Sequence, residues 1–412
     1  MPKFSLRMPK YYDRAMHASM LVLLLFGSIM IISTSVGESS ESIRVVIMAI
    51  IKQIAFVTLS YILMIFMAKN FAKFLSKETI VSKDPKKNKQ RKMAFRGLFN
   101  TAGVVILATL AITLVMPAVN GSKAWIPLGF MTIQPSEFAK TYLILLLGLT
   151  VNDYGSQKVK FSEYMKNPLI FYLAGVFIIF LQPDLGTLII FTIITMTILL
   201  IPSNPSLDFL KKIIRIGFII ILVAMLFIST DFGISILENF NMDYKMGRII
   251  NAADPFKDIF GDGYNLVYSL YAIASGGITG QGLGGSKQKF GYLPEAQTDF
   301  IFSVTIEELG LLGLGIIVVC YGIILWRLCY YAVKTPSEGF KMILVGCALY
   351  LASHFVLNVG GVSALIPLTG VPLLFISSGG SSLLSIMILF GVCQSIIALT
   401  RAQMRPMDAN RN

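Results

Sequence analysis

Ten apolar segments of near-spanning length are the feature that most constrains the fold of this chain. A helix needs about 20 residues, at a rise of about 1.5 Å per residue, to cross the hydrocarbon core of a bilayer. A segment in lipid must satisfy its own backbone hydrogen bonds, so these segments are expected to be helices. They lie at about residues 18–36, 44–67, 98–116, 138–151, 168–181, 186–201, 213–229, 300–326, 341–359 and 381–399.

We therefore predict an all-α integral membrane protein with about ten transmembrane helices, in which residues 1–412 form a single polytopic membrane domain. The composition agrees, because 55% hydrophobic and 14% charged residues leave too few polar side chains to cover a soluble globule. The net charge of +13 comes from blocks of Lys and Arg between the apolar segments, without an amphipathic face interleaved with aromatics. This pattern is typical of membrane topology, and we expect no nucleic-acid partner.

The distribution of basic residues predicts which connections face the cytoplasm. Lys and Arg concentrate in alternate connections, whereas residues 37–43 carry two glutamates and no base. The predicted cytoplasmic parts are the tails 1–17 and 400–412 and the basic loop 68–97. Both termini are then cytoplasmic, and residues 230–299 form a large extracytoplasmic loop between the seventh and eighth helices.

The first candidate site follows Trp125, where Gln134-Pro135-Ser136-Glu137 opens a helix that also carries Lys140. Glu137 and Lys140 are three residues apart and share one helix face just inside the membrane. Such a pair can simply stabilise the start of a helix. Charges inside lipid are expensive, however, so we treat both residues as candidates for a functional site.

A second polar stretch, Gln182-Pro183-Asp184, separates the fifth and sixth apolar segments. Pro183 ends one helix and Asp184 can cap the next, so a tight outer hairpin is expected. For Asp184 we favour capping over catalysis.

The long loop ends at Asp299, where a polar segment meets an apolar helix. No Lys or Arg lies within one helical turn of it in the sequence. A carboxylate at such a boundary suits a general base, although an N-cap of the eighth helix is the alternative. Arg248 lies earlier in the same loop, and the glycines at 280–284 do not form a dinucleotide fingerprint because no strand precedes them.

A fourth region consists of residues 358–361, 367–372 and 375–382, and its last part contains Ser377, Gly379 and Gly380. A Gly- and Ser-rich segment at the outer surface can offer backbone N–H groups and hydroxyls to a phosphate. Close packing of helices through small residues is the alternative. His17 and His354 each stand alone, and an isolated histidine is more often packed or interfacial than catalytic.

The residues alone leave open two classes of protein, an enzyme acting on an anionic lipid at the outer leaflet and a transporter whose cavity these charges line. The motifs in order closely resemble the SEDS family of shape, elongation, division and sporulation proteins. Tyr-Leu-Pro-Glu-Ala at 292–296, ahead of Asp299, looks more like the division branch, FtsW, than the elongation branch, RodA. The departures from the family pattern are Ala124, Gln297, Leu374 and Ser378.

The resemblance implies a peptidoglycan glycosyltransferase that polymerises lipid II into glycan strands at the outer face of the bacterial cytoplasmic membrane, during septal cell-wall synthesis. It also implies a class B penicillin-binding protein as the transpeptidase partner, further division or elongation proteins, and a divalent cation, Mg²⁺ or Mn²⁺. The alternatives are a lipid II flippase and a non-catalytic division scaffold. A flippase is disfavoured because the polar motifs cluster on one side, whereas alternating access usually places the site near the midplane.

The roles implied for single residues follow from the chemistry of lipid II. Asp299 would remove the proton from the acceptor 4-hydroxyl, and Lys140, Arg248 and the cation would stabilise the diphosphate leaving group. Glu137 would position Lys140 or hold the cation, for which Asp299 is the other candidate ligand. The remaining substrate-binding candidates are Trp125, Ser377, Gly379 and Gly380.

Overall fold

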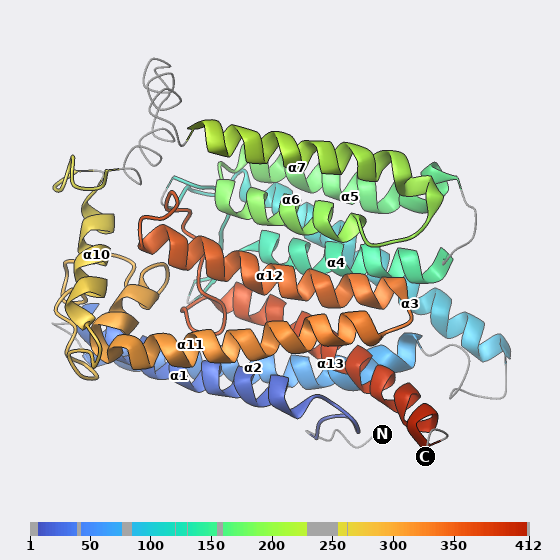
Figure 1. Cartoon of the computed structure of the whole chain (residues 1–412), viewed down its shortest axis with the longest axis horizontal. Coiled ribbons are helices and arrows are strands. Elements are labelled where there is room, and N and C mark those ends of the chain that lie inside the picture. The colour runs from blue at the N-terminus through green and yellow to red at the C-terminus, as the bar shows by residue number, and fades with distance from the viewer. Residues whose placement is uncertain are drawn as a thin grey trace.

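The computed structural model shows a bundle of long helices (Figure 1). It describes residues 7–38, 43–75, 85–119, 121–129, 131–154, 160–228, 254–261 and 263–409. The helices are α1 (Arg14–Glu38), α2 (Ile43–Leu75), α3 (Pro85–Thr113), α4 (Pro135–Tyr154), α5 (Phe161–Leu181), α6 (Leu185–Leu199), α7 (Asp208–Ile228), α10 (Tyr264–Gly276), α11 (Ile301–Lys334), α12 (Glu338–Val362) and α13 (Gly380–Ala409). A 3₁₀ turn, Pro205–Leu207, precedes α7, and two short strands, β1 (Ile126–Pro127) and β2 (Thr132–Ile133), pair as an antiparallel hairpin.

Each of the ten predicted apolar segments coincides with a helix, α1 to α7 or α11 to α13. Within the described ranges, seven of these are long and apolar enough to cross a membrane: α1, α2, α3, α5, α11, α12 and α13. The predicted all-α multi-pass membrane fold is confirmed. The number of crossings and the side that each connection faces stay predictions, since α6 is only 15 residues long.

The helices lie side by side along the long axis of the molecule, and α10 stands at one end (Figure 1). The start of α1 and the end of α13 lie together at the opposite end. α13 packs against α2, α4 and α12, and its side chains contribute heavily to the buried core. The polar motif at the start of α13 is therefore carried by a central helix of the bundle.

Close approach of α4 and α12 is made possible by two glycines that face each other. A Cβ on Gly148 would lie 2.8 Å from the Gly339 carbonyl oxygen, and one on Gly339 would lie 2.2 Å from that of Gly148. Small residues let helix backbones approach closely in membranes. This contact brings α12 against the helix that carries Glu137 and Lys140.

α11 has a break at Gly310, which adopts φ 58° and ψ −142°. The connection after α10 fits into this break: the Leu311 amide donates to the Ile278 carbonyl at 3.0 Å, and the Gln281 amide donates to the Glu307 carbonyl at 2.9 Å. The loop that precedes Asp299 is thus hydrogen-bonded to the helix that follows it.

Replacing Gly310 with alanine is expected to lower the free energy of unfolding by about 2–4 kcal/mol. The reason is steric, because the added Cβ would lie 2.4 Å from the Ile278 carbonyl oxygen at a backbone conformation that side chains avoid. The thermal unfolding temperature of the purified protein in detergent measures the effect. Gly315→Ala on the same helix is the control, since no atom lies within 4 Å of its added Cβ. Equal unfolding temperatures for the two variants would contradict this reading of the break.

Asp13 joins three helices at the end of the bundle where α1 starts. Its buried carboxylate accepts hydrogen bonds from Arg327 Nε at 2.9 Å, Arg401 Nη2 at 2.6 Å and the Met16 amide at 2.8 Å. Burial alone would raise the pKa of Asp13, but these hydrogen bonds and the two guanidinium charges lower it overall. The sequence analysis did not single out this cluster, which ties α1, α11 and α13 together.

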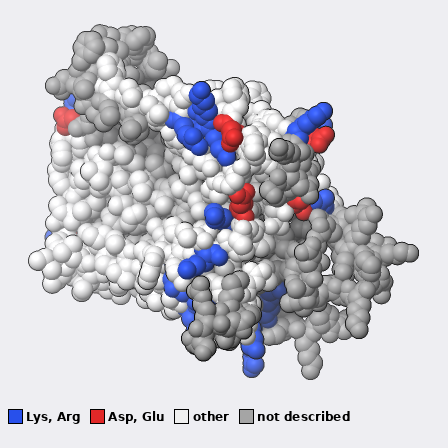
Figure 2. All heavy atoms as spheres, turned by 45° about the vertical axis from the view of Figure 1, so that its right-hand side comes forward, with Lys and Arg blue, Asp and Glu red and all other residues white. Residues whose placement is uncertain are grey.

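Charged side chains are unevenly distributed over the surface. Figure 2 shows Lys and Arg with a few acids toward the right-hand side of that view, while most of the broad face to the left carries none among the described residues. A face without charged side chains is compatible with lipid contact, because charges in lipid are costly. The basic end agrees with the predicted grouping of Lys and Arg on one side of the membrane.

Candidate functional site

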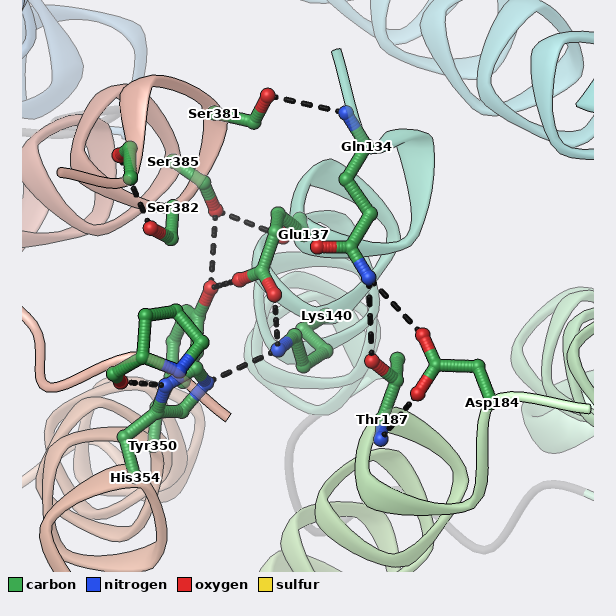
Figure 3. A network of polar contacts seen from close by, with 12 residues as sticks. Gln134, Glu137, Lys140, Asp184, Thr187, Tyr350, His354, Ser381, Ser382 and Ser385 are labelled. Atoms are coloured by element: carbon green, nitrogen blue, oxygen red, sulfur yellow. Dashed lines mark hydrogen bonds and ion pairs between the residues drawn. The ribbon is translucent and has the colours of Figure 1, made fainter. Parts of the chain in front are cut away.

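Gln134, just before α4, connects three of the polar motifs (Figure 3). Its side-chain Nε2 donates to Asp184 Oδ2 at 2.9 Å, and its backbone amide donates to Ser381 Oγ at 3.0 Å. Asp184 in turn accepts from the Thr187 amide at 3.0 Å and caps α6, as predicted. The starts of α4, α6 and α13 therefore meet at one place.

Glu137 and Lys140 form a buried ion pair on the first turns of α4, as their spacing predicted. Lys140 Nζ lies 2.8 Å from Glu137 Oε1. The Lys140 side chain has 0% of its surface exposed, so in this conformation the ammonium is not offered directly to a ligand. Removing both groups from water is costly, so their other bonding positions must also be satisfied.

Two residues of α12 provide further hydrogen-bond partners for Glu137 and Lys140. The Tyr350 hydroxyl donates to Glu137 Oε2, and His354 Nε2 lies 3.0 Å from Lys140 Nζ (Figure 3). His354 Nδ1 lies 2.9 Å from the Pro372 carbonyl oxygen, which only accepts. Nδ1 therefore carries the imidazole proton, and Nε2 accepts from the ammonium.

The backbone of Glu137 is held as well. Ser385 Oγ of α13 donates to the Glu137 carbonyl at 2.7 Å, and Thr141 Oγ1 lies 2.8 Å from Ser385 Oγ. Side chains of α4, α12 and α13 thus form one continuous buried network, shown in Figure 3. Such a network rigidifies the start of α4.

Asp299 lies at the end of the loop before α11, two residues ahead of Ile301. It is partly buried, and its Oδ2 lies 3.4 Å from where a Cβ on Gly370 would stand. α11 begins after Phe300, whose side chain makes no capping bond, so Asp299 does not occupy the capping position. Its carbonyl oxygen accepts from Asn358 Nδ2 at 2.8 Å.

Ser377, Gly379 and Gly380 have contacts within the protein. Ser377 Oγ donates to the Thr298 carbonyl at 2.7 Å and accepts from the Leu373 amide at 2.8 Å. A Cβ on Gly380 would lie 2.4 Å from the ring of Phe56, so close packing accounts for this glycine. The segment therefore holds the peptide that leads into Asp299, and Ser378 is exposed at its surface.

Trp125 directly precedes the β1–β2 hairpin and is partly buried. The neighbouring Lys123 amide donates to the Gln182 carbonyl at 3.1 Å, which places this tryptophan segment beside the turn between α5 and α6. Arg248, the other predicted substrate-binding residue, lies outside the described residues.

The structure adds residues that the sequence analysis missed. Lys289 and Glu308 are buried, and Nζ lies 2.8 Å from Oε1. Ser33 of α1 donates to the same carboxylate at 2.7 Å. The neighbouring acid, Glu307, accepts from the Lys287 amide at 3.0 Å. Two adjacent acids within an apolar helix were the available signal, because charges within lipid need partners.

The described residues contain no cluster of three or more His, Cys, Asp or Glu side chains that could hold a metal ion. Both carboxylate oxygens of Glu137 already have partners in Lys140 and Tyr350. Mg²⁺ is often held by only one or two carboxylates together with substrate phosphates. Which residues would hold a cation therefore stays a prediction.

Comparison with known proteins gives consistent matches. A family model described as a cell cycle protein, covering FtsW, RodA and SpoVE, matches residues 13–402. The stage V sporulation protein E of Bacillus subtilis is 34% identical over 304 residues, which cover 72% of this chain and 78% of that protein. A probable peptidoglycan glycosyltransferase FtsW of Thiomicrospira cyclica is 37% identical over 311 residues, covering 74% and 75%.

Two solved structures share the fold. One, from a study of how a peptidoglycan synthase complex coordinates polymerisation and crosslinking, has a TM-score of 0.66 at 22% identity and covers 94% of this chain and 98% of its own. The other, the rod shape determining protein RodA of Thermus thermophilus, has a TM-score of 0.58 at 22% identity and covers 95% and 97%.

Proposed function

Because this chain belongs to the family of cell cycle proteins that includes FtsW, RodA and SpoVE, we propose that it is a peptidoglycan glycosyltransferase that polymerises lipid II. The observation that carries the proposal is Asp299, a partly buried carboxylate. Its own carbonyl accepts from Asn358 of α12, and the preceding Thr298 carbonyl accepts from Ser377 of the Gly- and Ser-rich segment. The relatives named FtsW support it. We assign it to the division branch, which the relatives named FtsW support, and to septal cell-wall synthesis, which the SEDS resemblance implies.

The proposed reaction joins two lipid II molecules at the outer membrane surface. Asp299 accepts the proton of the acceptor 4-hydroxyl while that oxygen attacks the anomeric carbon of the donor, and undecaprenyl diphosphate leaves. The polar starts of α4 and α13 lie beside the segment that holds the peptide before Asp299, and we propose that the diphosphate binds there. Backbone N–H groups at the start of α13 suit an anion there.

Glu137 and Lys140 support this site from below its surface. Since Lys140 is fully buried, we assign the ion pair to holding α4 and His354 in place, and leave direct contact with the diphosphate to other groups. A divalent cation, Mg²⁺ or Mn²⁺, would be held by Asp299 and the substrate diphosphate and would neutralise negative charge.

The proposed partner is a class B penicillin-binding protein that crosslinks the new strand. The peptidoglycan synthase complex that shares this fold supports the pairing. The protein would then act in the bacterial cytoplasmic membrane with enrichment at the division septum.

Glycan-chain formation from purified lipid II tests the proposal. We expect polymer from the wild-type protein, alone or with a cognate class B penicillin-binding protein, in the presence of Mg²⁺, and less after chelation. A vesicle assay that follows movement of labelled lipid II across the bilayer runs in parallel. Translocation without polymer would favour the flippase, and neither activity would favour a scaffold.

A further inference from the structure

One face of α12 carries a buried polar stripe. Tyr350, His354 and Asn358 are spaced four residues apart, so they lie above one another on the same side of the helix. All three are buried, whereas Val356 on the same helix is 57% exposed. A polar stripe inside an apolar helix is costly unless its members have hydrogen-bond partners.

The first two residues of the stripe, Tyr350 and His354, contact the ion pair of α4. Tyr350 bonds Glu137, and His354 bonds Lys140. His354 then reaches the segment before α13 through the Pro372 carbonyl. This histidine therefore links the ion pair to a segment that lies beside Asp299.

The third residue of the stripe, Asn358, is hydrogen-bonded to the backbone carbonyl of Asp299. Asn358 Nδ2 donates to the Asp299 carbonyl at 2.8 Å and to the Val371 carbonyl at 2.9 Å, which uses both amide hydrogens. Asn358 Oδ1 is buried and has no hydrogen-bond partner among the described residues. The hydrogen bonds that Asn358 makes within the protein are therefore those donated by its Nδ2 group.

Asn358 completes a set of three bonds to consecutive carbonyls. The Ser378 amide donates to the Gln297 carbonyl at 2.9 Å, and Ser377 Oγ donates to the Thr298 carbonyl at 2.7 Å. The Asn358 bond to Asp299 is the third. Fixing three successive peptide planes fixes the direction in which the Asp299 side chain leaves the backbone.

We propose that Asn358 is a positioning residue for Asp299, and that the polar face of α12 sets the geometry of the carboxylate relative to the α4 ion pair. This inference rests on the proposed function. Asn358 acts through Asp299 and does not touch the reacting atoms. Displacement of a catalytic group by about 1 Å can cost about 10²-fold in rate.

The test is the isosteric variant Asn358→Asp, assayed for lipid II polymerisation by the full-length protein with its partner. The new carboxylate oxygen would face two carbonyl oxygens, so the Asp299 peptide is expected to shift. We expect kcat to fall about 10–100-fold while KM for lipid II changes less than about threefold.

Two controls separate positioning from general damage. Ser363→Ala is the matched control, because Ser363 Oγ near the end of α12 bonds the Val359 carbonyl of its own helix at 2.6 Å. It should keep wild-type kcat. If Asn358→Asp does not fold, Ser377→Ala tests the same idea, since it removes the bond to Thr298 and should also lower kcat selectively.

The outcomes are distinct. A folded Asn358→Asp protein with wild-type kcat, or a fall matched by Ser363→Ala, would overturn the positioning role while the proposed function stands. An inactive wild type would overturn the proposed function itself. Combining Asn358→Asp with Asp299→Asn should add no further loss, because a positioning residue has no effect without the group that it positions.

Discussion

Replacing Asp299 with asparagine will lower lipid II polymerisation about 10²–10⁴-fold, the usual contribution of a general base. Asparagine keeps the size of the side chain and leaves the backbone carbonyl that accepts from Asn358 in place. It removes the negative charge, and with it the ability to take up a proton or to help hold a cation. The change is measured as the initial rate of glycan-strand formation by purified protein with saturating lipid II.

Asp184→Asn is the matched control for this substitution. Asp184 caps α6 through the Thr187 amide, and asparagine caps a helix about as well as aspartate. The second bond of Asp184, from Gln134 Nε2, can be replaced if the Gln134 amide turns and its oxygen accepts from the asparagine. The control should therefore stay within a few-fold of the wild-type rate. Asp299→Asn with a rate near that of the control would show that Asp299 is not the base. The unfolding temperatures of both variants should remain close to wild type, since neither change leaves a cavity.

Replacing Lys140 with methionine will lower the free energy of unfolding by about 3–5 kcal/mol, because it leaves the Glu137 carboxylate buried without its cation. The double variant Glu137→Gln/Lys140→Met should regain most of that stability, since both charges are then gone. Polymerisation by the double variant should nevertheless stay about 10–100-fold below wild type, because methionine cannot donate to His354. Denaturation in detergent and the lipid II assay measure the two effects.

The second buried pair, Lys289 and Glu308, provides the comparison. It ties the loop before α11 to α1 and α11, and no described contact joins it to His354. Lys289→Met alone should destabilise by a similar amount, about 3–5 kcal/mol. The double variant Lys289→Met/Glu308→Gln should recover both stability and polymerisation. If Glu137→Gln/Lys140→Met kept full polymerisation activity, the Glu137–Lys140 pair would have a purely structural role, as is expected for Lys289 and Glu308.

Several details of the site followed from local sequence spacing. Glu137 and Lys140 are one helical turn apart, so their ion pair depends only on α4 being helical. Asp184 caps α6 because it directly follows Pro183, which cannot continue the preceding helix. These contacts join residues that are close together in the chain, so their spacing in the sequence is enough to predict them.

Other contacts depend on which helices pack together. His354 meets Lys140 across 214 residues of sequence, and Asn358 meets the Asp299 carbonyl across 59. Ser377 was predicted to serve a phosphate, but its hydroxyl is bonded to the Thr298 carbonyl and the Leu373 amide. No periodicity in the sequence indicates these partners.

The sequence by itself determined a helical membrane protein, because apolar segments of this length must satisfy their own backbone hydrogen bonds in lipid. It also determined where polar residues interrupt those segments. Only the tertiary structure decided which of those residues meet, since a buried polar group is stabilised by whichever partner the packing brings to it. The close contact of α4 with α12 at Gly148 and Gly339 brings the polar face of α12 against the ion pair, and that face also holds Asp299.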